Sequence, residues 1–76
     1  MDTAARDPEL VAFGRKVRAA RERTGKRIVD LVPEVDVSYW TLQRVETGRL
    51  RASNAVYWRI AKALDLDPTP VLRDAS

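Results

Sequence analysis

Apolar residues recur at helical spacing in the first third of the chain. Between Pro8 and Gly25 they stand three, four and three residues apart, as they do on one face of an α-helix. These positions are Leu10, Phe13, Val17 and Ala20. Asp7 and Pro8 are typical of a helix start, and Gly25 is typical of a helix end. The pattern predicts one amphipathic helix between these signals.

The next stretch, residues 26–35, has similar apolar spacing but contains a proline. Its apolar positions are Ile28, Leu31, Val32 and Val35. Pro33 lacks a backbone donor and crowds the preceding turn, which costs about 3 kcal/mol in a helix interior. We expect a second helix that is either kinked at Pro33 or late in starting its first hydrogen-bonded turn. Asp36 suits the following turn, because aspartate tolerates the left-handed conformation.

Residues 38–47 predict a third helix with two dissimilar faces. Ser38 is a good N-cap, Leu42 and Val45 supply apolar anchors, and Gly48 marks the end. The same spacing turns four polar or aromatic side chains outward: Tyr39, Trp40, Gln43 and Arg44. A helix with a narrow apolar seam and such an outer face is suited to contact another molecule.

The last third of the chain predicts two further helices and no strand. Ser53 or Asn54 would cap a fourth helix. Its buried stripe would comprise Tyr57, Ile60, Ala61 and Leu64. Asp67 and Pro68 repeat the start signal, so a short fifth helix is expected over residues 68–73.

Length and composition exclude several classes of function. Seventy-six residues allow one domain with a small core. We expect a flexible N-terminal arm at residues 1–7, a folded domain at 8–73 and a tail at 74–76. Without cysteine or histidine, disulfides, the commonest general base and the commonest metal ligand are excluded, so we expect no enzyme, cofactor or metal site. No apolar run approaches the ~20 residues of a membrane span, and no signal peptide is recognisable, so we expect a cytoplasmic protein.

The charge is concentrated in the middle of the chain. The net charge is +3 overall, but residues 15–62 hold twelve basic and five acidic residues, a net charge of +7. Acidic ends around a basic centre are typical of a protein that binds a polyanion. Basic surface residues can also serve solubility alone, so charge by itself does not decide between these interpretations.

Several motifs together resemble the phage repressor and Cro-like helix-turn-helix family, also called XRE-type. The chain reads FGRKVRAARERTG over residues 13–25, and Val37 and Ser38 match the family's turn and cap. Leu42 and Val45 match the apolar pair of its recognition helix, followed by Glu46 and Gly48. IAKAL at residues 60–64 and DLDPTPVL at 65–72 resemble its fourth helix and the start of its fifth.

The resemblance implies an all-α, compact five-helix, lambda-repressor-like helix-turn-helix domain. It also implies a sequence-specific double-stranded DNA-binding transcriptional regulator, a Cro-like repressor associated with the nucleoid of a bacterial or phage-infected cell. Three positions depart from the family pattern. Arg27 and Ile28 replace its usual serine cap and DNA-contacting glutamine, Asp36 replaces its turn glycine, and Pro33 is unusual within the second helix. These departures concern the geometry of the second helix.

In this family the third helix enters the major groove, which assigns expected contacts. The residues expected to contact bases are Tyr39, Trp40, Gln43 and Arg44. The residues expected to contact phosphates are Arg27, Thr47, Arg49, Arg51, Ser53 and Asn54. Arg21 and Glu46 match a structural pair that joins the first and third helices of the family. Trp40 could instead fill a gap beside the second helix, and Trp58 could be core edge or a subunit contact.

A module of this size reads few base pairs, so we expect a homodimer on a palindromic operator. Trp58, Val71 and Leu72 are candidates for the dimer contact. An excisionase or MerR-like protein is an alternative, but it needs a β-wing where this chain reads as helix. A protein-interaction module such as an antitoxin, contacting a protein through Trp40 and Trp58, is a further alternative.

Overall fold

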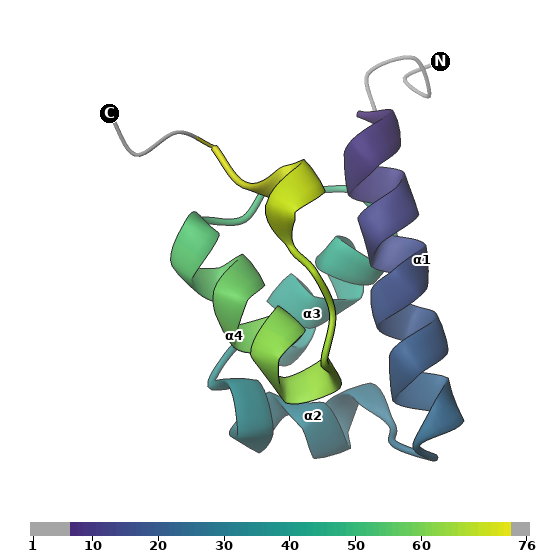
Figure 1. The fold of residues 1–76 in the computed structure, drawn as a ribbon. Helices are drawn as coiled ribbons and strands as arrows, with labels where there is room; N and C mark the ends of the chain where they lie inside the picture. Colours follow the sequence, from purple (N-terminus) through teal and green to yellow (C-terminus); the bar gives the residue numbers. More distant parts are fainter. Residues whose placement is uncertain (1–6, 74–76) are drawn as a thin grey trace.

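The computed structural model describes residues 7–73 and shows four α-helices and one short 3-10 turn (Figure 1). The elements are α1 (Pro8–Arg23), α2 (Ile28–Val35), α3 (Tyr39–Glu46), α4 (Asn54–Leu64) and η2 (Thr69–Val71). The helical prediction is confirmed, and no strand occurs in this part of the chain. Except for Asp7, the predicted arm at residues 1–7 and the tail at 74–76 lie outside the described residues.

The helix starts follow the predicted caps. The Asp7 carboxylate accepts a hydrogen bond from the backbone N–H of Glu9 at 2.8 Å. Ser53, rather than Asn54, caps α4 and accepts from the N–H of Val56 at 3.2 Å. Each of these bonds satisfies an N–H group that the first turn of a helix leaves unpaired.

One core joins all the elements. It contains the predicted stripes of α1, α3 and α4, together with Leu31, Val35 and Val37 from α2 and the turn after it. Phe13 of α1 and Tyr57 of α4 meet edge to face, with ring centroids 5.5 Å apart. The Tyr57 hydroxyl accepts the Ala52 backbone N–H at 3.0 Å, which ties the loop before α4 to this core.

The prediction of a fifth helix over residues 68–73 is wrong. The segment contains only the three-residue 3-10 turn Thr69–Val71, and Leu72 is already extended. Pro70 disfavours the α conformation at Thr69, the residue before it, and so opposes the first turn of an α-helix. The Asp67 carboxylate instead accepts from both the N–H and the hydroxyl of Thr69, which stabilises a tight turn.

The position of Pro33 shows how α2 accommodates a proline. The helix begins at Ile28, later than residue 26, and continues through Pro33 to Val35. Pro33 is therefore the sixth helical residue and leaves the carbonyl of Val29 without its usual donor. Both residues are exposed, so water can reach this side of the helix. The core-facing residues Leu31 and Val35 remain buried.

Candidate nucleic-acid interface

The candidate site is built on two short helices, α2 and α3, and the tight turn between them. Asp36 ends α2 in the left-handed conformation, with φ 54° and ψ 48°, as its residue type predicts. Val37 then turns into the core, and Ser38 caps α3 by accepting from the Thr41 N–H at 3.1 Å. Arg59 of α4 donates to the Asp36 carbonyl at 3.4 Å. The turn is thus held at both of its ends.

The inner face of α3 is fixed against α1. Leu42 and Val45 are buried, and Glu46 is only 9% exposed. The carboxylate of Glu46 accepts two bonds from the guanidinium of Arg21, Nε to Oε2 at 2.6 Å and Nη2 to Oε1 at 3.0 Å. The remaining Nη1 of Arg21 donates to the Lys26 carbonyl at 2.8 Å. This geometry fixes the angle between the two helices, since a bidentate pair is directional.

Electrostatics reinforce this ion pair. The hydrogen bond to Glu46 raises the pKa of Arg21, and the negative charges of Glu46 and Glu22 add to the effect, although partial burial opposes it. Arg21 therefore stays protonated, and Glu46 has a permanent cationic partner. The resemblance alone implied this pair, because its two members are 25 residues apart.

A glycine that the sequence pattern did not single out allows the close approach of α1 and α3. A Cβ atom at Gly14 would lie 2.6 Å from the carbonyl oxygen of Glu46 and would also collide with the carbonyl of Val45. Any larger residue would push the helices apart. Gly48 plays a similar part after α3: its φ is +69°, and a Cβ there would lie 2.7 Å from Cγ2 of Val11. A helix-interior glycine beside an apolar stripe is the only sequence signal for Gly14.

The outer face of α3 is open. Trp40 is 64% exposed and Tyr39 is 40% exposed, while Arg44 is exposed and Gln43 is half-buried. Trp40 therefore does not fill a gap beside α2. Its ring meets that of Tyr39 edge to face, with centroids 5.2 Å apart. The structure brings the four predicted base-contacting residues to one side of α3, and Arg44 takes part in none of the ion pairs among residues 7–73.

The predicted phosphate-contacting residues differ in whether their side chains already bond to other parts of the protein. Arg49 is exposed, and none of the ion pairs found within the described chain involves it. Arg27 is also exposed, but its guanidinium pairs with Asp30 at 3.1 Å. This hydrogen-bonded pair raises the pKa of Arg27 and lowers that of Asp30. The hydroxyl of Thr47 donates back to the Gln43 carbonyl at 3.1 Å. Of Arg27 and Arg49, Arg49 alone presents a cation that no ion pair within residues 7–73 engages.

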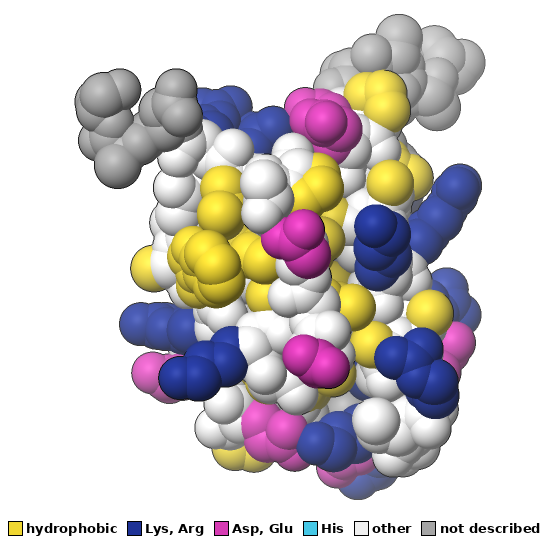
Figure 2. Space-filling model, in the orientation of Figure 1, with side chains coloured by type: hydrophobic (Ala, Val, Ile, Leu, Met, Phe, Trp, Pro, Cys, Tyr) yellow, Lys and Arg dark blue, Asp and Glu magenta, His cyan; other side chains and the backbone are white. Residues whose placement is uncertain are grey.

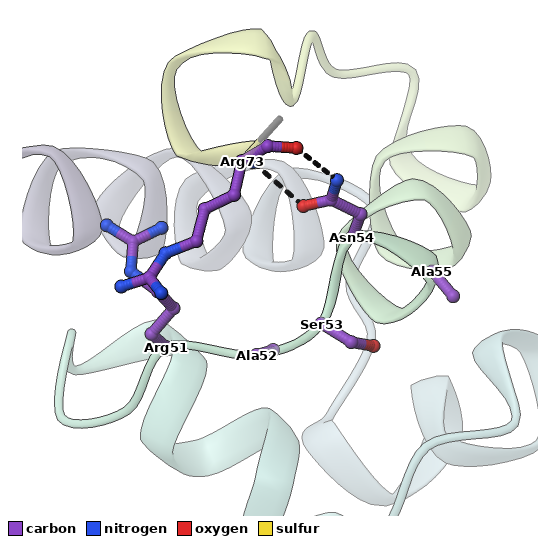
Figure 3. Close-up of a pocket in the computed structure, with 6 residues that line it drawn as sticks. All are labelled: Arg51, Ala52, Ser53, Asn54, Ala55 and Arg73. Atoms are coloured by element: carbon purple, nitrogen blue, oxygen red, sulfur yellow. Dashed lines mark hydrogen bonds between the residues drawn. The ribbon is translucent and has the colours of Figure 1, made fainter. Parts of the chain in front are cut away.

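Arg51 and Asn54 hold the loop before α4 to the last part of the fold. Arg51 donates to the Val71 carbonyl at 2.9 Å and to the Asp7 carboxylate at 3.0 Å. The Asn54 amide donates to the Arg73 carbonyl at 2.6 Å and accepts the Arg73 N–H at 2.9 Å (Figure 3). With Ser53 they border an open hollow of about 650 Å³. Within it, the side chains of Arg51 and Arg73 reach toward the same end (Figure 3).

The face of the molecule shown in Figure 2 carries an apolar patch. Figure 2 shows hydrophobic side chains gathered over α4 and the segment that follows it, with α3 behind this face. Trp58 of α4 is 54% exposed and so is not a core residue. Val71 is buried in the core and cannot form part of a contact surface, whereas Leu72 is half-buried. No helix in residues 7–73 is long and apolar enough to cross a membrane.

Comparison with known proteins agrees with this geometry. The family described as "Helix-turn-helix domain" matches residues 12–75. No curated protein sequence matches the chain. Among solved structures, the chain is similar to the restriction-modification controller protein C.AhdI from Aeromonas hydrophila, with 26% identity and a TM-score of 0.74, covering 86% of this chain and 98% of that one.

The match and the arrangement of α2, turn and α3 confirm the family inferred from the motifs. The strand-containing β-wing that an excisionase or MerR-like protein needs is absent from residues 7–73. The chain belongs to the helix-turn-helix domain family, is of XRE type, and is a DNA-binding transcriptional regulator.

Proposed function

We propose that the protein is a repressor that inserts α3 into the major groove of a specific double-stranded operator. The observation that carries the proposal is the outer face of α3, where Trp40 and Arg44 are exposed while the opposite face is held against α1. Arginine can donate two bonds to guanine, and glutamine can pair with adenine, so Arg44 and Gln43 suit direct readout.

In this proposal the loop after α3 contacts the backbone of the DNA. Arg49 supplies a free guanidinium for a phosphate, and Ser53 and Asn54 supply backbone N–H groups at the start of α4. Arg51 and Asn54 are committed through their side chains to other parts of the fold. Their proposed role is therefore to position the loop, with any phosphate bond made by main-chain groups. A phosphate that contacts Arg27 would share its guanidinium with the Asp30 carboxylate.

We further propose a homodimer on a palindromic operator. One copy of α3 has eight residues and can read only a few base pairs, so a second copy would supply the missing affinity. The exposed Trp58 of α4 and the apolar patch over α4 in Figure 2 offer a candidate surface for the second copy.

Selection of bound sequences from a random double-stranded DNA pool tests the proposal. We expect an enriched palindromic motif whose half-sites are one helical turn apart, and a transcript that falls when the motif overlaps a promoter. An enriched motif without palindromy would overturn the dimer. A transcript that rises would replace the repressor with an activating regulator. Absence of binding even at low salt would favour a protein-interaction module.

A further inference from the structure

Trp40 occupies the centre of the open face of α3. At about 100° per residue, it lies almost opposite the midpoint between the buried Leu42 and Val45. It is also the second residue of the helix, and the first turn of a recognition helix is the part that meets base edges. Its ring is the most exposed large apolar side chain among residues 7–73, at 64%.

The ring is also oriented before any ligand arrives. Tyr39 stands edge to face with it, at 5.2 Å between centroids and 86° between planes. Tyr39 is itself 40% exposed, and it lines a small hollow with Arg21, Ile28 and Gln43. An edge-to-face contact favours the rotamers of Trp40 that make it, so less freedom is lost when the ring is covered.

The major groove offers one kind of apolar group to such a ring. Base edges there present donors and acceptors, except for the C5-methyl group of thymine. A methyl group at C5 of cytosine would occupy the equivalent place. The flanking Gln43 and Arg44 end in polar groups suited to donors and acceptors of the bases, so the indole and the edge of Tyr39 offer the largest apolar contact on this face.

We propose that Trp40, oriented by Tyr39, reads the C5-methyl group of a pyrimidine in each half-site. The inference rests on the proposed docking of α3 and specifies the ligand chemistry: thymine or 5-methylcytosine is preferred over the same base without its methyl group. Burial of one such carbon corresponds to about a fourfold change in affinity.

The experiment uses the operator obtained by selection, with each thymine replaced in turn by deoxyuridine, and each cytosine by 5-methylcytosine. Binding is measured by fluorescence anisotropy at fixed salt. For the unaltered protein we expect about a fourfold loss at one thymine per half-site, or about a fourfold gain at one methylated cytosine. The two arms distinguish the source of the methyl group.

Variants then assign the effect to the ring. Trp40→Ala should bring the ratio of affinities for methylated and unmethylated base to about one, whereas Trp40→Phe, which lacks the indole N–H, should preserve it. Val29→Ala is the control, since this exposed apolar side chain lies on α2, and the ratio should stay unchanged. Melting temperatures confirm that each variant is folded.

The outcomes separate this inference from the proposed function. Binding that shows no methyl dependence at any position, or a ratio that survives Trp40→Ala, overturns the role of Trp40 and leaves DNA binding intact. Loss of the ratio in Trp40→Phe would contradict an apolar contact that any aromatic ring at this position could make. Failure to select any DNA would refute the proposed function itself.

Discussion

The two faces of α3 differ in how closely the rest of the chain packs against them. On the inner face, Glu46 is held by Arg21, and Gly14 lets the helix backbones touch. On the outer face, Trp40 and Arg44 stand free of the core. One eight-residue helix thus separates stability from recognition, because adjacent residues serve different partners. Changes on the inner face should alter folding, and changes on the outer face should alter only what is bound.

The largest expected effect is on the inner face. Glu46→Ala leaves the Arg21 guanidinium, whose side chain is 12% exposed, without its partner. We expect a loss of about 3 kcal/mol in the free energy of unfolding, measured by urea denaturation. The control is Glu22→Ala, which removes an exposed pair with Arg18 and should cost less than about 0.5 kcal/mol. Equal losses in the two variants would contradict a special role for the inner pair.

Gly14→Ala should have the next largest effect. Alanine favours helix over glycine by about 1 kcal/mol, yet its Cβ would sit 2.6 Å from the Glu46 carbonyl oxygen. We expect a net destabilisation of about 2 kcal/mol, seen as a lower melting temperature. The exposed position 19, changed from alanine to glycine, measures the propensity term alone. A stabilised Gly14→Ala protein would show that α1 and α3 are not in close contact.

Arg44→Ala tests the outer face. The expected cost is about 1–3 kcal/mol in binding at one base pair, with relaxed preference there, because the guanidinium would no longer pair with a base. The melting temperature should stay within experimental error, since no ion pair among the described residues involves Arg44. An equal loss of affinity for every DNA sequence would reassign Arg44 to a phosphate.

The salt dependence of DNA affinity should distinguish the two arginines of the loop after α3, Arg49 and Arg51. Arg49→Ala should reduce the slope of log affinity against log salt by about one, as expected for one lost phosphate contact. Arg51→Ala should instead lower the melting temperature, because it removes bonds to Asp7 and Val71, and should leave the slope nearly unchanged. Opposite results would exchange the roles of the two residues.

The smallest effect should appear with pH. Hydrogen bonds from Arg27 lower the pKa of Asp30, and those from Thr69 lower the pKa of Asp67, from an ordinary 3.8. Their contributions to stability are present above pH 3.8 and are lost as pH falls through the lowered pKa values. Asp30→Asn and Asp67→Asn should each flatten the acid limb of the unfolding curve. An unchanged limb would show that these bonds do not stabilise the fold.

Local signals made much of the fold predictable. Caps such as Ser38, and apolar spacing such as that of Leu42 and Val45, depend only on neighbouring residues, so the sequence indicated α1, α3 and α4 closely. The prediction of a fifth helix was wrong because the start signal at Asp67 and Pro68 took no account of Pro70, which disfavours the α conformation at Thr69.

Long-range contacts were not predictable from spacing. The resemblance implied the Arg21–Glu46 pair, but nothing local indicated that Arg51 would bond to Asp7, 44 residues away, or that Asn54 would bond to Arg73. The arginines of this chain therefore include some that hold the fold together and some that no ion pair within residues 7–73 engages. The tertiary fold decides which arginines are structural. That the outward-facing residues of α3 contact DNA stays a prediction.

The guanidinium of Arg51 bonds at once to residue 7 and to residue 71. The two limits of the folded domain thus lie within one side chain of each other. A circularly permuted protein, joined there by a short linker and opened at an exposed site elsewhere, should keep the same core.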